Sequence, residues 1–276
     1  MLKKISSKYH RDGITGLVLS TPRFVTRQAH NAINRVIFPV WSRLPATRNA
    51  IWNDVKVPSE VAPGPRHLDT LISAPVRTDY PKSEAGEVAG HEHRTQSGDN
   101  VVIIGGGRGV TAVRAAQAVG PEGSVLVYEG GQEYVELIRD VASLNGVSNR
   151  VEVRHALVGP GLSIYGTPDG AESVDPAEIP ECDVLELDCE GAEAEIFPHL
   201  EVRPRVIILE VHAREYDNPE RWRQDLDDLG YEIVDRRTNE GEPLTETGLR
   251  NEIMGNVEGD KHSPIVIAIH QDYYGK

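Results

Sequence analysis

Residues 101–109 have the sequence VVIIGGGRG, which gives the clearest indication of the fold class. The first four residues are apolar and β-branched, which predicts a strand buried on both faces, as in a parallel sheet. Gly105, Gly106, Gly107 and Gly109 follow and predict a turn in which the backbone can approach a ligand closely. A helix of small residues comes next, and its N-terminus is expected to open toward the same ligand.

The alternation of strand and helix continues to the end of the chain. Further strands are expected at residues 124–128, 151–158, 183–187, 206–211, 231–234 and 264–270. This pattern predicts an α/β fold with a Rossmann-like, doubly wound sheet of seven strands. The last two strands are separated by a polar loop without a clear helix, which indicates an antiparallel end.

Residues 98–276 are expected to form the main domain, preceded by an entry segment or linker over residues 51–97. Residues 51–57 alternate enough to form one strand, and a proline-rich connector follows it. Residues 91–93 read HEH, but no third ligand lies nearby in the sequence. This triplet therefore indicates a solvated helix face and not a metal site.

Residues 1–50 form an electrostatically different region. They carry nine Lys and Arg against one acidic residue, whereas the rest of the chain carries 20 against 42. From Pro22 to Ile37 apolar residues recur at helical spacing, with arginines outside the apolar arc, and Pro39 follows. This predicts a basic amphipathic N-terminal extension that packs on the chain's own core, docks on a partner or makes peripheral contact with an anionic membrane surface.

Composition narrows the classes of protein. The net charge is -14, and the chain has 22 Arg, 7 Lys and three Phe. This predicts a protein adapted to high salt, as in halophilic archaea, and argues against nucleic acid as a partner of the acidic domain. No apolar run of about 18 residues and no signal peptide is visible, so a cytoplasmic protein is expected. Cys182 and Cys189 are expected to be reduced and structural.

The end of the second expected strand points to an adenosine-containing cofactor. Glu129 ends this strand, 20 residues after Gly109, and Gly130 follows it. An acid there can accept hydrogen bonds from both ribose hydroxyls of an adenosine. Ala156 lies near the end of the third strand, where an adenine normally sits, and its small side chain leaves room for the ring.

The glycine turn alone leaves the cofactor open. Residues 107–112 satisfy the G-x-G-x-x-A variant of the dinucleotide fingerprint, which a nicotinamide- or flavin-dependent oxidoreductase would use. Gly105, Gly107 and Gly109 instead fit the turn of S-adenosylmethionine (SAM) methyltransferases. Those enzymes usually carry an acid two residues before the first glycine, where this chain has Ile103. A catalytically degenerate, methyltransferase-like binding module is therefore a third alternative.

Two motifs at the ends of the fourth and fifth strands distinguish between these alternatives better than the glycine turn does. Residues 188–193 read DCEGAE and residues 210–212 read EVH. The pattern D-x-E-G-A-E followed by E-x-H resembles the FkbM family of SAM-dependent methyltransferases, over roughly residues 98–270. The resemblance implies a class I methyltransferase fold, with seven strands and the last one antiparallel, and SAM as the cofactor. It also implies O-methylation, often of a sugar hydroxyl on a glycan or a glycosylated acceptor.

The carboxyl ends of parallel strands meet in one crevice, so the side chains of both motifs are expected to cluster. These side chains are Asp188, Glu190, Glu193, Glu210 and His212. His212 is the leading candidate for the general base, because a neutral imidazole can accept a proton near pH 7. Asp188 is the second candidate, and Glu190 and Glu210 are expected to position the sugar. The set could also bind a divalent cation, but we assign no metal, because negative groups beside a sulfonium need none.

Overall fold

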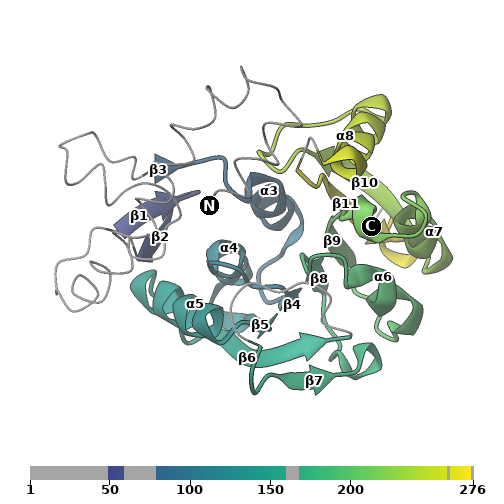
Figure 1. Cartoon of the computed structure of the whole chain (residues 1–276). Helices are drawn as coiled ribbons and strands as arrows, with labels where there is room; N and C mark the ends of the chain where they lie inside the picture. Colours follow the sequence, from purple (N-terminus) through teal and green to yellow (C-terminus); the bar gives the residue numbers. More distant parts are fainter. Residues whose placement is uncertain (1–48, 59–78, 160–167, 260–261, 275–276) are drawn as a thin grey trace, which may run out of the picture. The chain divides into compact units, whose positions relative to one another are not determined.

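The computed structural model describes residues 49–58, 79–159, 168–259 and 262–274. Its main element is a sheet of eight strands in the order β10-β11-β9-β8-β4-β5-β6-β7 (Figure 1). The strands are β4 (Asn100–Ile104), β5 (Ser124–Glu129), β6 (Val151–Val158), β7 (Glu172–Val174), β8 (Val184–Leu187), β9 (Val206–Glu210), β10 (Tyr231–Arg237) and β11 (Ile265–His270). The basic extension was expected over residues 1–50. Residues 1–48 lie outside the described residues.

The pairing of these strands confirms the predicted fold class. The six strands from β4 to β9 run parallel, whereas β11 pairs antiparallel with both β9 and β10. The seven expected strands are all present, and the short strand β7 adds an eighth that was not expected. The prediction of a polar loop without a clear helix between β10 and β11 was wrong, because helix α8 (Glu246–Glu258) lies there.

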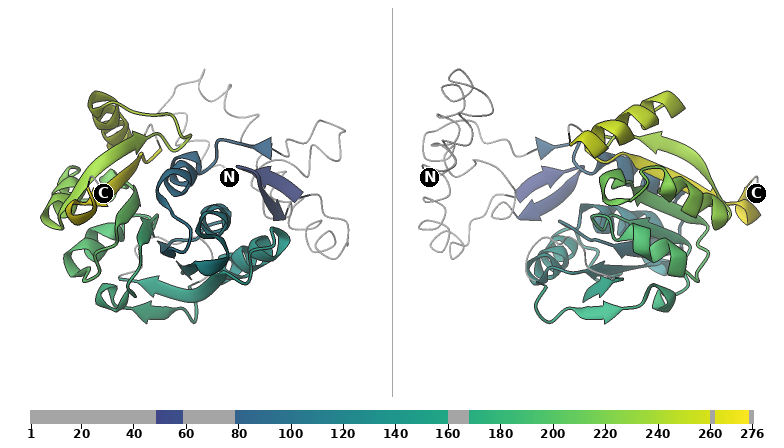
Figure 2. Two further views of the ribbon diagram at one scale, coloured as in Figure 1. Left: turned by 180° about the vertical axis from the view of Figure 1, so that it is seen from behind. Right: turned by 45° about the vertical axis from the view of Figure 1, so that its right-hand side comes forward.

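Helices cover both faces of the main sheet. One face carries α3 (Ala85–Arg94), α4 (Val110–Val119) and α5 (Gln132–Leu144), and the other carries α6 (Glu193–Ile196) and α7 (Arg221–Asp228) (Figures 1 and 2). Short 3-10 turns complete the chain: η1 (Gly120–Glu122), η2 (Pro176–Glu178), η3 (Phe197–His199), η4 (Ala213–Glu215) and η5 (Gln271–Tyr273). Coverage on both faces explains the unbroken apolar runs of the central strands. In the described ranges, no helix has the length and apolarity needed to cross a bilayer.

A three-stranded sheet precedes the main one, in the order β2-β1-β3. β1 (Asn49–Trp52) and β2 (Val55–Pro58) form an antiparallel hairpin, and β3 (Asp79–Tyr80) pairs parallel with β1. The prediction of a single strand over residues 51–57 was therefore wrong, because these residues belong to a hairpin of two strands. Asn53 and Asp54 have positive φ values of 44° and 65°, as the two central residues of a tight hairpin turn do.

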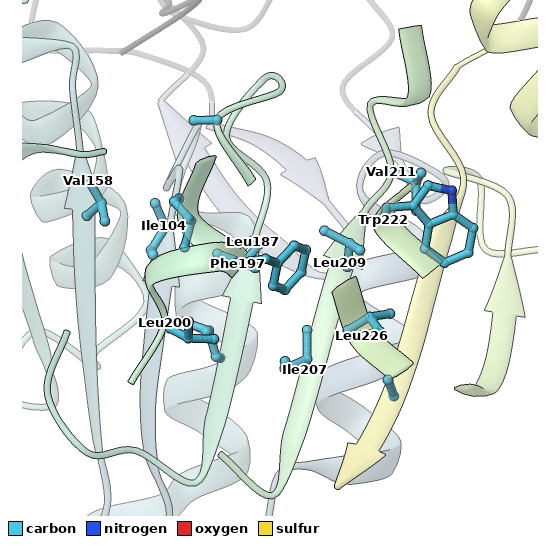
Figure 3. Packing of buried hydrophobic residues seen from close by; sticks show 14 of the residues in the cluster. Ile104, Val158, Leu187, Phe197, Leu200, Ile207, Leu209, Val211, Trp222 and Leu226 are labelled. Atoms are coloured by element: carbon cyan, nitrogen blue, oxygen red, sulfur yellow. The ribbon is translucent and has the colours of Figure 1, made fainter. Parts of the chain in front are cut away.

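An apolar core lies between the main sheet and the layer of α6 and α7. Leu187 and Leu209 of the central strands belong to one cluster with Phe197, Trp222 and Leu226 of that layer (Figure 3). All five residues are at most 2% exposed. Burying a side chain of this size contributes about 1.5–3 kcal/mol. This core supports the ends of β8 and β9, from which both acidic motifs extend.

Candidate active site

A cavity of about 400 Å³ lies at the carboxyl ends of β4, β5, β6, β8 and β9. Open α/β sheets bind their ligands at this edge. The predicted site residues that line it are Gly105, Gly107, Glu129, Gly130, Ala156, Asp188, Glu190 and Glu210. Three other predicted residues, Gly106, Gly109 and His212, are not part of its lining.

The glycine turn contacts the loop that carries the acidic motif. Gly105 has a φ of +92°, and a Cβ on it would lie 1.7 Å from the backbone oxygen of Asp188. Only glycine permits so close an approach in this conformation. Gly107 has a φ of +49°, and nothing lies within 4 Å of the position that its Cβ would take. The turn is therefore tightly packed at Gly105 and leaves room for a ligand at Gly107.

Glu129 binds the glycine turn through its carboxylate. Oε2 accepts hydrogen bonds from the backbone N–H groups of Gly106 and Gly107 at 3.0 Å, and Oε1 accepts one from Gly131 at 2.8 Å. Burial raises the pKa of Glu129, and these three hydrogen bonds oppose the rise. Since a carboxylate has about four acceptor positions, about one remains for a ligand hydroxyl.

The side of the cavity expected to hold adenine is formed by β6 and the loop after β5. Ala156 is buried at 2% exposure and lines the cavity. His155 Nε2 lies 3.0 Å from the backbone oxygen of Gly130, which holds the loop against β6. Ile103 is fully buried within β4, and β4 contains no acidic residue. The acid that SAM methyltransferases usually place on this strand is therefore absent.

Glu193 joins the loop after β8 to the segment after β9. Its Oε2 accepts hydrogen bonds from the Gly191 N–H at 3.0 Å and from the Cys189 thiol at 3.3 Å. Its Oε1 accepts one from the His212 N–H at 3.3 Å and lies 2.8 Å from His212 Nδ1. Glu193 is fully buried at the first position of α6, where a carboxylate also stabilises the helix N-terminus. These contacts indicate that Glu193 holds the two segments together and does not contact a ligand.

His212 lies behind the carboxylates that line the cavity and is 3% exposed. Its Nε2 is 3.7 Å from Glu190 Oε2 and 3.9 Å from both Asp188 Oδ1 and Glu210 Oε2. The structure therefore brings all four predicted catalytic residues together. Glu190 adopts a φ of 54°, a strained conformation that is common at functional sites.

The surroundings of His212 favour its protonated form. Burial lowers the pKa of His212, but the hydrogen bond and charge of Glu193, with the charges of Asp188 and Glu190, raise it to about 9. Near pH 7 both ring nitrogens then carry a proton, and the ring has no lone pair to accept another. This disagrees with the expected neutral imidazole, because the sequence could not reveal how many carboxylates surround the ring.

The carboxylates around His212 are also perturbed. Burial raises the pKa of Asp188, while a hydrogen bond with Glu210 and the charge of His212 oppose the rise. Burial likewise raises the pKa of Glu210, and the charges of Asp188 and Glu87 raise it further. A carboxylate with a raised pKa is a better proton acceptor near neutral pH than an ordinary one.

Two acids that the sequence analysis missed line the cavity from the start of α3. They are Glu84, which precedes the helix, and Glu87 in its first turn. Burial and the charge of Asp188 raise the pKa of Glu84 to about 8, against the opposing charge of Arg108. Burial, followed by the charge of Asp188, raises the pKa of Glu87 well above its usual range.

The signal for this buried helix face was a pair of glycines four residues apart. Gly86 and Gly90 lie on the face of α3 that packs against β11 and β9. A Cβ on Gly86 would lie 2.4 Å from Ile265 Cγ1, and one on Gly90 would lie 2.9 Å from Ile208 Cδ1. Residues four apart in a helix share a face, so this spacing indicates close packing there.

The HEH triplet divides between core and solvent. His91 is fully buried, with Nε2 against Glu186 and Nδ1 3.0 Å from Thr95 Oγ1. Glu92 and His93 are exposed. The prediction of a solvated face was therefore right for the last two residues and wrong for His91.

Basic groups are few in the cavity. Among the described residues that line it, Arg108 and His262 are basic, against six carboxylates. The guanidinium of Arg108 lies 4.9 Å from the ring centre of Trp52, which stacks on Tyr80 at 4.6 Å. The small sheet therefore helps to place one of the few cations of the site.

Several solved structures resemble the chain at low sequence identity. An O-methyltransferase from Bacillus cereus in complex with SAH is 15% identical, with 74% of this chain and 88% of that chain covered and a TM-score of 0.43. A SAM-dependent O-methyltransferase from Thermotoga maritima is 16% identical, with 73% and 69% covered and a TM-score of 0.42. With TM-scores below 0.5, these similarities are too low to assign a function. No curated protein gives a significant match.

A family model matches the part of the chain that holds both acidic motifs. Residues 169–233 match the methyltransferase FkbM domain. The D-x-E-G-A-E segment at residues 188–193 and the E-x-H segment at residues 210–212 both lie inside this match. The match confirms the family resemblance. The segment that carries both motifs is therefore similar to a methyltransferase FkbM domain, and the match indicates a SAM-dependent methyltransferase.

Proposed function

We propose that the protein transfers a methyl group from SAM to a hydroxyl oxygen of a sugar, on a glycan or a glycosylated acceptor. One observation carries this proposal: a single cavity extends from the glycine turn and Glu129 to the carboxylates of Asp188, Glu190 and Glu210. A methyl donor and a hydroxylated acceptor can therefore lie side by side within it.

The cofactor side of the cavity offers a partner to each part of SAM. Glu129 Oε1 retains about one acceptor position, enough for one ribose hydroxyl where two were expected. Ala156 leaves room for the adenine ring. Arg108 can pair with the methionine carboxylate. Glu84 can pair with the methionine ammonium in place of the acid that is missing at Ile103.

The acceptor side supplies a proton acceptor. When bound, SAM supplies a methyl carbon that passes from sulfur to the acceptor oxygen, while the electron pair of the broken S–C bond stays on sulfur. Asp188 takes the proton that the acceptor hydroxyl loses as its new O–C bond forms. The raised pKa of Asp188 suits this role. The cavity walls hold the two reactants in line, which contributes much of the rate.

His212 positions the carboxylates in this proposal and is not the base. Its Nε2 lies 3.7–3.9 Å from oxygens of Asp188, Glu190 and Glu210, so a positive ring offsets part of their mutual repulsion. Glu193 holds the other ring nitrogen at 2.8 Å. The ring is thereby locked in one orientation behind the reacting groups.

A sugar fits the polar character of the acceptor side. Carboxylates accept hydrogen bonds from hydroxyls, and Glu190, Glu210 and Asn239 line this side of the cavity. An apolar acceptor would cover these half-buried polar groups without offering them partners, which is costly. The alternative cofactors, a nicotinamide or a flavin, would leave the acidic cluster without a function.

Transfer of a labelled methyl group from SAM to extracted glycans and glycolipids tests the proposal. Asp188→Asn is expected to lower kcat by about 10²–10⁴-fold, with the Kd for SAM nearly unchanged, because it removes the proton acceptor and keeps its shape. Glu92→Gln, on the exposed side of α3, is the matched control and should retain full activity. Full turnover in Asp188→Asn, or SAM binding without transfer to any hydroxylated acceptor, would contradict the proposal.

The basic residues 1–50 lead to a proposal about where the acceptor is met. We propose that they hold the enzyme peripherally at an anionic membrane surface, where lipid-linked glycans are assembled. Nine cations against one acid, on a segment with amphipathic spacing, support this. The full chain should co-sediment with anionic vesicles, and a full chain with Arg23, Arg27 and Arg35 replaced by Glu should not. Equal sedimentation of the two would contradict this proposal.

A further inference from the structure

Glu87 is a buried carboxylate whose function the proposed methyl transfer does not explain. It is 1% exposed, and neither of its side-chain oxygens has a hydrogen-bond partner among the described residues. A buried carboxylate without a partner is strongly unfavourable unless a counter-charge faces it. The fold nevertheless places Glu87 at the wall of the cavity, so a ligand that enters the cavity can reach it.

Two further carboxylates face Glu87. One oxygen from each of Glu87, Asp188 and Glu210 lies within 4.8 Å of the other two. Oxygens bind magnesium or calcium at about 2.0–2.6 Å, so two ligands of one ion are at most about 4–5 Å apart. The three oxygens already satisfy this spacing. They come from α3, from the loop after β8 and from the end of β9, which are held by separate parts of the fold.

The charge around these oxygens also favours a cation. Glu84 and Glu190 line the same cavity, whereas Arg108 and His262 are the basic residues among its described lining. A bound cation would offset the mutual repulsion of these carboxylates.

We propose that Glu87, Asp188 and Glu210 bind one divalent cation of the magnesium, manganese or calcium class. An all-oxygen set of carboxylates is the ligand chemistry that these ions prefer. The two strand-end motifs alone predicted no metal, because negative groups beside a sulfonium need none. Glu87, from a helix about 100 residues earlier in the chain, supplies the third side of the site.

The function of the cation rests on the proposed methyl transfer. An acceptor hydroxyl that became a further ligand would lose its proton more readily, because a cation lowers the pKa of a bound hydroxyl. Asp188 has two carboxylate oxygens, so one can bind the cation while the other takes the proton. Binding of the cation itself requires neither SAM nor an acceptor, and it can be measured without them.

Titration of Mn²⁺ into the chelator-treated full chain, followed by the electron paramagnetic resonance signal of free Mn²⁺, tests the proposal. We expect one Mn²⁺ per chain, displaced by excess Mg²⁺ or Ca²⁺. Glu87→Gln should weaken binding by at least about tenfold, because even outer partners of a metal site contribute that much. Glu92→Gln is the matched control, since it removes an exposed carboxylate of the same helix and should leave binding unchanged.

Glu210→Gln provides a second variant in case Glu87→Gln does not fold, and it should weaken binding to a similar extent. The absence of Mn²⁺ binding to the full chain would overturn the proposal, and so would equal binding by both Gln variants and the Glu92→Gln control. If Glu87→Gln weakens SAM binding in metal-free buffer and Mn²⁺ does not bind, the cluster holds the methionine ammonium instead. A failure of methyl transfer with Mn²⁺ still bound would affect only the proposed function.

Discussion

The two sides of the cavity differ in how their acidic groups are satisfied. On the cofactor side, Glu129 receives three backbone N–H donors at 2.8–3.0 Å. On the acceptor side, Asp188, Glu190 and Glu210 lie 3.7–3.9 Å from His212 Nε2. Glu87 has no hydrogen-bond partner within the described part of the chain. The carboxylate on the cofactor side is held by backbone donors, whereas those on the acceptor side lie close together without such donors.

This difference separates two uses of buried charge. A carboxylate that the backbone already satisfies is oriented before a ligand arrives, so it can position a cofactor at little further cost. A group of unsatisfied carboxylates destabilises the folded protein until a cation or a hydroxylated ligand binds. Removing one carboxylate should therefore change the stability of the ligand-free protein in opposite directions on the two sides.

The largest effect is expected where the two sides meet, at Gly105. A Cβ there would lie 1.7 Å from the Asp188 backbone oxygen, so Gly105→Ala must separate the glycine turn from the acidic loop. We expect a loss of more than about 3 kcal/mol in the free energy of unfolding, measured by urea denaturation.

Gly98→Ala is the matched control for this change. Gly98 has nearly the same φ, +90° against +92°, but nothing lies within 4 Å of its Cβ position. It should therefore lose only the cost of the left-handed conformation, about 1–2 kcal/mol. Equal losses for the two variants would mean that the approach of Gly105 to Asp188 does not connect the two sides.

The next effect compares one carboxylate from each side. Glu129→Gln should lower the free energy of unfolding of the ligand-free protein by about 2 kcal/mol, because charged hydrogen bonds to the glycine turn are lost. Glu210→Gln should leave that free energy unchanged or raise it, because it removes a carboxyl group whose ionisation is opposed by burial and by the charges of Asp188 and Glu87. Thermal unfolding in chelator measures both. Destabilisation of similar size in the two variants would remove the distinction between the sides.

A smaller effect concerns pH and Glu84. The pKa of Glu84 is about 8 in the folded protein against 4.5 in the unfolded chain, so the folded form binds the proton more tightly. The contribution of Glu84 to the free energy of unfolding is therefore largest below pH 4.5, and it is lost as the pH rises toward 8. Glu84→Gln should flatten the fall by about 1 kcal/mol, since the side chain is only half-buried. Urea unfolding at pH 5 and pH 8.5 measures this, and identical slopes for wild type and variant would refute it.

The smallest effect concerns the two thiols, one on the acceptor side and one away from it. Burial raises the pKa of Cys182 to about 12, and burial and the charge of Glu193 raise that of Cys189. Both should react slowly with iodoacetamide at pH 8 in the folded protein and quickly in urea. Fast labelling of Cys189 alone, which lines the cavity, would indicate that the acceptor side is less negative than described.

The strands could be predicted from the sequence because their signal is local. Unbroken apolar runs such as 101–104 and 206–209 indicate strands buried on both faces, wherever those strands later pair. Helix α8 was missed because only Leu249, Ile253 and Asn256 of its residues are buried, which leaves too narrow an apolar face to recognise. The hairpin of β1 and β2 was missed because its turn, Asn53 and Asp54, interrupts the alternation by only two residues.

Only those site residues that lie at or directly after the ends of strands could be predicted from the sequence. Asp188 and Glu190 follow β8 and Glu210 ends β9. These strands are parallel neighbours, so the convergence of the three side chains follows from topology. Glu87 belongs to helix α3, which packs on β9 and β11. The spacing of Gly86 and Gly90 indicates a closely packed helix face, but it does not specify which strands that face contacts. The protonation of His212 depends on Glu193 and the cluster around it, so spacing in the sequence could not indicate it.

Calorimetric titration measures whether the glycine turn and Glu129 bind SAM. SAM and SAH should each bind the full chain in a one-to-one ratio, NAD and FAD should not bind, and Glu129→Gln should weaken both SAM and SAH by about tenfold or more. Glu92→Gln should bind them as the wild type does. Binding of NAD or FAD without SAM, or SAM binding that Glu129→Gln leaves unchanged, would contradict the account.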